Sequence, residues 1–597
     1  MHGGRDEISV HVRAMEEILK RDSYYEIPLY QRNYDWDFDD HVIEFWNDLK
    51  KEYESNLREK YFFGTLMLVN TYEEKDRFII IDGQQRLTTS LMLIVAFRDY
   101  FLEQGDTIKV DSLNKTLITE YTKLPRLTLN VYNKDYFLKK ILEPKNIHKK
   151  ITALLDDSSI KTKNKKLQKA YVALAQKILD YKKGETTQKE ELSNIIEHFL
   201  RYFTIVENLI DDLEKAYRIF ENINSKGLDL APSDLVKNYL FEKIALGSKS
   251  LSTQEREDLI LEADEIWQSI VRILEMAKPI TESIFLRMYL TAFVRLVSKE
   301  DIYKTIKVEY ETKEQVDNFL RRLELRVSNL HKLVKPSLED WNGDSEVVDC
   351  LQSLRKLGQG AMYPILLSGM EKFTKPNDIK KLIITSTKLF FRAKTVCSRN
   401  FSDLENLVDD ICKVIRADKE VTISKIQKIM FDWNQYPPDE EFKVKFKTLE
   451  LTDARAKYAL SEIHYEMKGG RSSSTEILSD KAQIEHIMPQ KIKNSPWENE
   501  IKQNKGYTND TEVDEYKKIN LNKLGNLTIL NSVKNIKNSN KSFSEKKIIY
   551  GNSNEITMTR DLERQPQWTD DEIQTRQDGF IPLAVKIWNL KPTDNTD

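Results

Sequence analysis

Short apolar runs alternate with turn-like segments near the start of the chain. Residues 62–69 and 77–81 are dominated by apolar and β-branched side chains, and the polar segment 72–76 separates them. This pattern predicts two strands of a hairpin. Residues 24–36 are aromatic and contain Pro28, which excludes a helix interior and predicts an extended segment.

Most of the remaining chain places apolar residues every three or four positions, the spacing of helices with one buried face. The ranges with this pattern are 5–20, 41–54, 87–101, 140–215, 213–224 and 232–460. Only 18 glycines and 15 prolines interrupt 597 residues, which favours long helices. We therefore predict a mainly α chain with small β elements, an α+β fold.

The clearest linker is the glycine- and serine-rich segment 469–474, GGRSSS. A chain of this length accommodates several domains. We predict an α+β N-terminal domain at 1–235, an α-helical extension at 236–465 and a C-terminal domain at 475–597.

Composition excludes several classes of protein. The formal net charge is −3, so nucleic-acid contacts must come from local patches. Three cysteines without a Cys-x-x-Cys pair argue against a disulfide framework and a zinc ribbon. Residues 1–20 contain no apolar core of signal-peptide length, and the longest apolar run, Leu91–Phe97, is too short for a membrane span. The sequence thus predicts a cytoplasmic protein with no membrane partner.

The C-terminal region contains the segment IEHIMPQ, residues 484–490. On a strand, the neighbours Glu485 and His486 point to opposite sides. Histidine suits a general base near neutral pH, because its side chain ordinarily titrates there. Residues 516–550 carry eight lysines and one acid, a local charge that suits a phosphate backbone. Taken singly, such a histidine is more often structural and such a helix more often a solvated face.

The order of these residues resembles the HNH, or ββα-metal, nuclease family. The resemblance implies that Glu485 is a metal ligand, that His486 deprotonates water and that Asn526 orients His486. It implies Asn535 as the second ligand, with Asn531 and Asn540 as alternatives, and Mg²⁺ or Mn²⁺ as the metal. The residues expected to contact DNA are Lys534, Lys537, Asn540, Lys541, Lys546 and Lys547.

The N-terminal segment IDGQQRLTT, residues 81–89, leads from a strand through a glycine into a helix. A helix N-terminus offers free N–H groups to an anion, and Arg86, Thr88 and Thr89 add donors. Asp82 could bring Mg²⁺, and Gln84 or Gln85 could position water or ribose. Alternatively, Asp82 and Arg86 form a structural ion pair and the threonines cap the helix. No P-loop pattern is present.

Two further clusters leave alternatives open. The segment 27–36, IPLYQRNYDW, places Gln31 and Arg32 among aromatic residues that either stack on a base or belong to the core. In the segment 220–228, FENINSKGL, residues 224–227 either end a helix or close over a nucleotide.

Together these clusters resemble the ParB/sulfiredoxin-like domain in the GmrS half of GmrSD-type enzymes, and the C-terminal motif resembles the GmrD half. Such enzymes bind and hydrolyse NTPs and cut modified DNA in anti-phage defence. The resemblance implies a nucleotide site formed by Gln31, Arg32, Asp82, Gln84, Gln85 and Arg86, with Thr88, Asn224 and Lys226 as further members.

We thus expect an NTP-regulated, metal-dependent DNA endonuclease that restricts base-modified or phosphorothioated DNA and has NTPase activity. The nucleotide is GTP, UTP or another NTP, and a homodimer is an open expectation. One alternative is an NTP-switched DNA-binding or signalling factor with an inactive HNH module. Another is a nuclease that acts on unmodified DNA or RNA.

Overall fold

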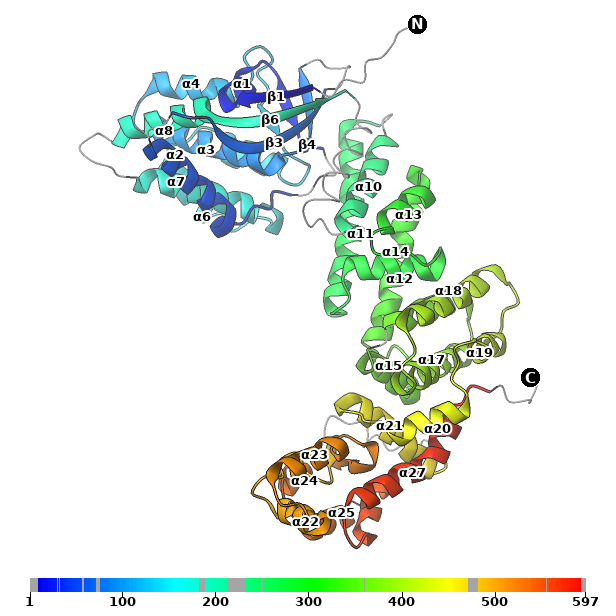
Figure 1. Ribbon diagram of the computed structural model, residues 1–597. Coiled ribbons are helices and arrows are strands. Elements are labelled where there is room, and N and C mark those ends of the chain that lie inside the picture. The colour runs from blue at the N-terminus through cyan, green and yellow to red at the C-terminus, as the bar shows by residue number, and fades with distance from the viewer. Residues whose placement is uncertain are drawn as a thin grey trace. The chain divides into compact units, whose positions relative to one another are not determined.

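The computed structural model divides the chain into two compact units, which Figure 1 shows with their helices and strands. The first unit comprises Met1–Trp267 with Ile306–Leu320, and the second Gln268–Thr305 with Arg321–Asp597. The three-domain division stays a prediction, and each unit contains part of the expected helical extension. The structure describes residues 9–28, 31, 33–55, 58–70, 76–181, 188–211, 232–248, 251–358, 360–470, 482–553 and 556–591.

The first unit contains a six-stranded mixed sheet in the order β1-β6-β3-β4-β2-β5. Its strands are β1 (Ser9–Ala14), β2 (Tyr24–Glu26), β3 (Tyr61–Asn70), β4 (Arg77–Asp82), β5 (Leu127–Thr128) and β6 (Phe203–Ile210). The predicted hairpin is confirmed, because β3 and β4 pair antiparallel. Strand β6 lies between β1 and β3, antiparallel to β1 and parallel to β3.

Apolar side chains extend from both faces of strand β3. Leu66 and Leu68 join the main core of the unit, whereas Met67 and Val69 form a smaller cluster with other strand residues. Successive strand residues face opposite sides, so a strand that is buried on both faces reads as an unbroken apolar run. This explains why 62–69 shows no polar alternation.

Helices pack on the sheet of the first unit, with the long α3 among them (Figure 1). Every residue of α3 from Leu87 to Phe101 is buried. The helices of this part of the chain are α1 (Met15–Lys20), α2 (Ile43–Ser55), α3 (Gln84–Glu103), α4 (Thr107–Leu117), α5 (Lys134–Tyr136), α6 (Ile147–Leu155), α7 (Lys165–Asp180) and α8 (Gln188–Tyr202).

Two helix predictions are wrong in part. Residues 9–14, expected in a helix over 5–20, form the edge strand β1, and residues 203–210, expected in a helix over 140–215, form β6. The two strands pair with each other across almost 200 residues of sequence. Local periodicity cannot detect such a partner, because tertiary pairing overrides intrinsic propensity. The predicted helix 213–224 lies outside the described residues.

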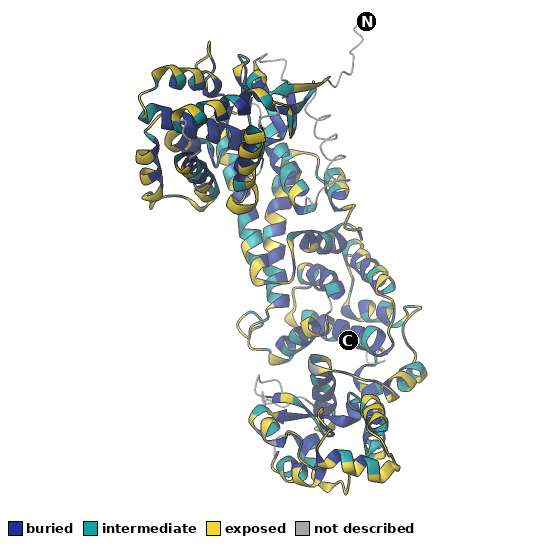
Figure 2. Ribbon diagram, turned by 60° about the vertical axis from the view of Figure 1, so that its left-hand side comes forward, coloured by how far each residue is buried: buried dark blue, intermediate teal, exposed yellow. Residues whose placement is uncertain are grey.

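The predicted helical region 232–460 is confirmed in its described residues, and the fold is mainly α with small β elements. Figure 2 shows helices that bury one side and expose the other. These helices are α10 (Pro232–Leu246), α11 (Thr253–Met276), α12 (Glu282–Phe293), α13 (Ile302–Glu309), α14 (Lys313–Val334), α15 (Ser345–Lys356), α16 (Tyr363–Lys372), α17 (Pro376–Phe390), α18 (Phe401–Ala417), α19 (Ile423–Phe431), α20 (Asp439–Lys447) and α21 (Asp453–Met467).

The rest of the second unit surrounds a two-stranded sheet of β7 (Ala482–His486) and β8 (Leu527–Asn531). In the ranges that the structure describes, no helix combines the length and apolar character needed to cross a bilayer. The remaining helices are α22 (Pro496–Lys505), α23 (Asp510–Asn520), α24 (Ser532–Asn538), α25 (Phe543–Gly551), α26 (Thr557–Arg560) and α27 (Asp570–Ile587).

His464 on α21 makes the second unit sensitive to acid. Its ring is fully buried, and burial lowers the pKa of the imidazole to about 4. The unfolded chain therefore binds this proton at higher pH than the folded chain, so stability falls as pH drops from about 6.5 towards 4. We expect a loss of up to about 3 kcal/mol, and less in His464→Gln. Urea unfolding at pH 7 and pH 5 measures the difference, and equal acid sensitivity of both proteins would contradict it.

Candidate functional site

Strand β7, strand β8 and helix α24 form a compact ββα unit from segments about 40 residues apart in the sequence. β7 pairs antiparallel with β8, from Ala482 opposite Asn531 to His486 opposite Leu527. α24 begins directly after β8, and the Asn531 side chain caps it by accepting from the Val533 N–H. The structure thus joins the two C-terminal motifs in the order strand, strand, helix.

Glu485 and His486 leave β7 on opposite sides, as the sequence predicts. Glu485 is 5% exposed, and its Oε1 accepts hydrogen bonds from Lys546 Nζ at 2.7 Å, Tyr550 OH at 2.9 Å and Asn538 Nδ2 at 3.2 Å. His486 is only half-buried. The carboxylate therefore belongs to the interior, and the imidazole to the surface.

Lys546 of α25 places its ammonium beneath the end of β7. Besides Glu485, it donates to the carbonyl oxygens of His486 at 2.9 Å and Ile487 at 3.1 Å. Burial raises the pKa of the Glu485 carboxyl and lowers that of the Lys546 ammonium, while the attraction between the two opposes both shifts. One buried cation thus neutralises the acid and holds the backbone of the candidate base.

This arrangement corrects two expectations from the sequence. Lys546 is 0% exposed, so it does not contact a phosphate backbone. The Glu485 carboxylate already faces an ammonium at hydrogen-bond distance, and a second cation there would be repelled. Asn535 donates to Ile484 O at 3.2 Å and is also 3.4 Å from Gln483 Oε1.

The expected ligand pair of Glu485 and Asn535 therefore does not fit Mg²⁺ or Mn²⁺. The described part of the chain also holds no group of three or more histidine, cysteine, aspartate or glutamate side chains placed to bind a metal.

The His486 ring lies between two amide side chains. Its Nε2 is 3.3 Å from Asn522 Oδ1, and its Nδ1 is 3.5 Å from Gln490 Nε2. An amide oxygen only accepts hydrogen bonds, so Asn522 favours the tautomer with hydrogen on Nε2. Nδ1 is then the basic atom, on the side of the exposed Gln490. Sequence reasoning missed Asn522, which is one of seven asparagines between 520 and 540.

Asn526 acts on the backbone after His486 and not on its ring, which corrects the orienting role expected from the sequence. Its Oδ1 accepts from Met488 N at 2.8 Å and Trp568 Nε1 at 3.1 Å. Its Nδ2 donates to Met488 O at 3.1 Å and Leu521 O at 2.9 Å. All four hydrogen-bonding positions of the amide are used, so none remains for the imidazole.

Helix α27 fixes the backbone on either side of Asn526. Gln577 Oε1 accepts from Gly525 N at 2.8 Å, and Arg576 Nη1 donates to the carbonyls of Gly525 and Leu527. A Cβ atom on Gly525 would lie 2.1 Å from Ile573 O, so no larger residue fits. The glycine of the sequence motif is required by this close helix contact.

The other expected DNA contacts lie near the ββα unit. Lys541 is exposed, Asn540 and Lys547 are half-buried, and the half-buried Lys534 donates to Asn552 O at 2.7 Å. The Lys537 side chain lies outside the described residues. Among the lysines of this set whose side chains the structure describes, Lys541 is the most exposed.

In the first unit, β4 passes into α3 through Gly83. Gly83 has φ +91°, and an added Cβ would lie 2.8 Å from Thr65 O. Only glycine adopts this conformation at so close an approach without strain. The N-terminus of α3 therefore starts against β3, and its N-cap residue, Gly83, makes no side-chain hydrogen bond to the first N–H groups.

Asp82, Gln84 and Arg86 are half-buried around this helix start. Arg86 Nη1 donates to Thr65 O at 3.2 Å. Its guanidinium passes over Gly64, where a Cβ would lie 2.6 Å from Arg86 Nε. The Arg86 guanidinium, the Gln84 amide and the backbone N–H groups of this helix start can bind an anion, whereas the Asp82 carboxylate would need a cation beside it.

The other expected nucleotide ligands have structural partners. Thr88 is 1% exposed and donates to Gln84 O at 2.7 Å, as Thr89 does to Gln85 O at 2.9 Å. The cavity beside Thr88 measures about 10 Å³, which is too small for more than one water. Thr88 therefore does not contact a nucleotide in this conformation.

Gln31 and Gln85 hold the segment between β2 and α2. Gln31 Nε2 donates to Ile80 O at 2.8 Å. Gln85 donates to Asn33 O at 3.1 Å and accepts from Asp35 N at 2.9 Å. Both side chains thus support the helix start, and their assignment as nucleotide ligands stays a prediction. Arg32, Asn224 and Lys226 lie outside the described residues.

Two family models match the chain. The model of the GmrSD restriction endonuclease N-terminal domain matches residues 15–241, and that of the C-terminal domain matches residues 436–582. Together they span more than half of the chain and contain both sites described above. No curated protein gives a match.

Removing one partner of the Glu485–Lys546 pair should destabilise the second unit. Glu485→Gln leaves a buried ammonium without its counter-charge, and we expect a loss of about 3 kcal/mol. Adding Lys546→Met to this variant should restore part of the loss. Thermal unfolding of the full chain measures both, with Glu440→Gln at the exposed Glu440–Lys443 pair as the control. An unchanged melting temperature with a weakened response to Mg²⁺ would instead support the ligand role.

Proposed function

The chain belongs to the family of GmrSD restriction endonucleases, and on this premise we propose that it hydrolyses DNA phosphodiester bonds at the ββα unit. The observation that carries the proposal is the His486 ring, half-exposed and bounded by Asn522 and Gln490. A ring held in one tautomer at the surface is what a general base requires. No other histidine follows His464 in the sequence.

In the proposed reaction, His486 Nδ1 takes a proton from the water that attacks the phosphorus atom, and the bond from phosphorus to the leaving 3′ oxygen breaks. Asn522 accepts from Nε2–H and stabilises the imidazolium that forms. Asn526 and Lys546 keep the backbone of residues 486–488 in place, so the ring needs little rearrangement when DNA binds. Lys541 contacts a phosphate and adds sequence-independent affinity.

A requirement for Mg²⁺ or Mn²⁺ stays part of the proposal, as a prediction from the resemblance. A divalent cation would stabilise charge on the scissile phosphate and the leaving oxygen. Since Glu485 and Asn535 do not fit as a ligand pair, we assign no ligand set in this chain. Cleavage with Mg²⁺ or Mn²⁺ against excess EDTA tests the requirement directly.

We propose further that the N-terminus of α3 binds the phosphates of an NTP. The support is a helix start whose N-cap, Gly83, has no side chain to bond the first N–H groups, together with Gln84 and Arg86. Asp82 would hold a Mg²⁺ that accompanies the phosphates. NTP binding and hydrolysis at this site would regulate cleavage, since an unregulated nuclease endangers the DNA of its own cell. The proposed target is base-modified or phosphorothioated phage DNA, and the proposed role is anti-phage defence.

One observation favours a second function. The acid next to His486 is neutralised by Lys546 and withdrawn from solvent. An NTP-switched DNA-binding or signalling factor with a catalytically silent ββα unit is consistent with such a site. DNA binding and NTP turnover without cleavage of modified DNA, unmodified DNA or RNA would identify it.

His486→Ala should lower DNA cleavage by about 100- to 10,000-fold, since a positioned general base contributes about this much. Asn522→Ala should lower cleavage less and shift its pH profile, because the ring then loses the acceptor that fixes its tautomer. Single-turnover cleavage of modified phage DNA and unmodified plasmid with Mg²⁺ measures both. His331→Ala on α14 is the matched control. Full activity of His486→Ala would exclude the proposed base.

Arg86→Ala should weaken NTP binding about 10- to 100-fold, because a guanidinium–phosphate contact contributes about 1.5–3 kcal/mol. Titration calorimetry with GTP, UTP, ATP and CTP measures the affinity. Arg77→Ala is the matched control, since Arg77 on the adjacent strand pairs with Glu26 at the surface. Equal NTP affinity of the wild type and Arg86→Ala would place the nucleotide elsewhere.

A further inference from the structure

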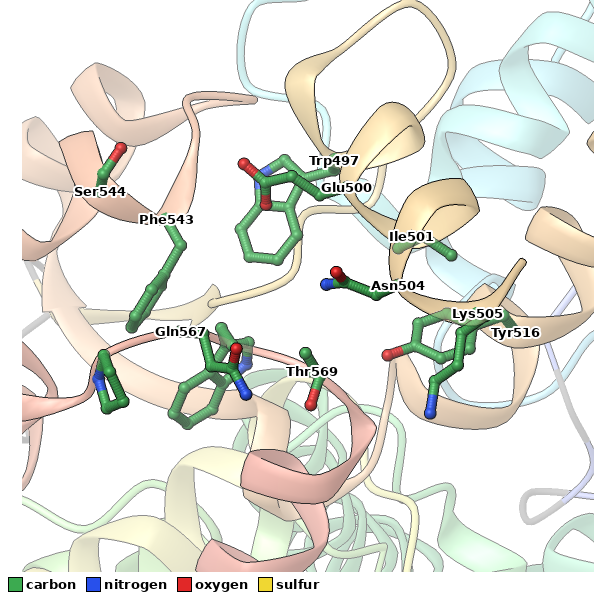
Figure 3. A pocket seen from close by; sticks show the side chains of 12 residues that line it. Trp497, Glu500, Ile501, Asn504, Lys505, Tyr516, Phe543, Ser544, Gln567 and Thr569 are labelled. Atoms are coloured by element: carbon green, nitrogen blue, oxygen red, sulfur yellow. The ribbon is translucent and has the colours of Figure 1, made fainter. Parts of the chain in front are cut away.

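The second unit contains an aromatic pocket beside the ββα unit that none of the proposed steps uses. Figure 3 shows it from close by, with side chains from α22, α25 and the segment 566–569 around its mouth. Trp497, Phe543 and Trp568 form its apolar wall. Phe543 stacks on Trp568 with ring centroids 5.4 Å apart, and Trp497 meets Phe543 edge-on at 6.4 Å.

The pocket has the size of one ring. Its volume is about 190 Å³. A cavity of about 150 Å³ accommodates benzene, so this pocket accepts a six-membered ring with its substituents but not a whole nucleotide. The aromatic walls favour a flat ligand, because offset stacking and apolar burial both act on its faces.

Polar groups on the rim offer the hydrogen bonds of a base edge. The rim carries the carboxylate of Glu500 and the amides of Asn504 and Gln567. A carboxylate accepts from an exocyclic amino group, and amides pair with ring nitrogens and carbonyls. Partial burial raises the pKa of the Glu500 carboxyl, consistent with its position over the pocket.

Two consecutive hydrogen bonds connect the pocket wall to residues 486–488, the segment that carries the proposed base His486. Trp568 Nε1 donates to Asn526 Oδ1, and the same oxygen accepts from Met488 N, two residues after His486. Trp497 Nε1 donates to Lys541 O at 2.7 Å, beside the proposed phosphate contact. A ligand in the pocket therefore contacts Trp568 and Trp497. Through Asn526, Trp568 supports the backbone after His486, and Trp497 holds the backbone of Lys541.

We propose that this pocket binds one nucleobase with an exocyclic amino group, cytosine or adenine, turned out of the DNA duplex. The proposal rests on the proposed DNA cleavage. An enzyme that examines a base within a duplex must remove it from the stack, and stacking on aromatic side chains offsets part of that cost. A base bound in the pocket would then affect the position of the segment that carries His486, through Trp568 and Asn526.

Nucleoside binding tests the site without any cleavage step. Saturation-transfer NMR of the full chain is recorded with 2′-deoxycytidine, 2′-deoxyadenosine, thymidine and methyl glucoside as probes. Asn504→Trp fills the pocket from its exposed rim, and Gln503→Trp adds the same side chain to the neighbouring exposed position of α22 outside the pocket.

We expect base-proton signals from deoxycytidine or deoxyadenosine in the wild type and Gln503→Trp. In Asn504→Trp binding should be about tenfold weaker, the loss expected when one stacked base is displaced. Signals of undiminished strength in Asn504→Trp, signals from methyl glucoside alone, or no signal from any nucleoside would each overturn the proposal.

Cleavage provides the second readout. On DNA that the wild type cuts, Asn504→Trp should lower the single-turnover rate about tenfold, and Gln503→Trp should leave it unchanged. Equal rates in the two variants would exclude a role in substrate recognition. If the wild type cuts no DNA while Asn504→Trp still loses nucleoside binding, the cleavage proposal fails and the nucleobase site stands.

Discussion

The buried Lys546 ammonium is the interaction on which the C-terminal site depends. It binds the Glu485 carboxylate and the carbonyl oxygens of the next two residues, so three consecutive residues share one cation. A charge this deep is tolerated only with such partners, and the partners are then held firmly. The same cation that keeps Glu485 inside the protein leaves His486 facing outward at the end of β7.

Around this ion pair, neutral amides complete the loop after β7. Asn526 uses all four of its hydrogen-bonding positions to join Met488, Leu521 and Trp568. Gln577 and Arg576 of α27 then hold the backbone around Asn526. Three separate stretches of chain thus meet at one side chain, which connects the proposed base to the aromatic pocket.

In the first unit, backbone conformation at two glycines, and not a buried ion pair, positions the candidate site at the start of α3. Gly64 and Gly83 both have positive φ and both lie where a Cβ would collide, with Arg86 in one case and with Thr65 and Leu66 in the other. They bring the start of α3 against β3 and let one guanidinium cross the strand. Gln31 and Gln85 support this arrangement through main-chain hydrogen bonds, which leaves a small polar end of the sheet for an anion.

The sequence by itself determined the mainly helical fold, the β3–β4 hairpin, the opposite directions of Glu485 and His486, and the family to which the motifs belong. These follow from local periodicity, strand alternation and motif order, which need no distant partner. Only the tertiary structure decided that 9–14 and 203–210 are paired strands, that Asn522 and not Asn526 meets the His486 ring, and that Lys546 neutralises Glu485. A lysine in a basic run and an asparagine among seven look alike in sequence, and their burial and partners arise when segments far apart in the chain pack together.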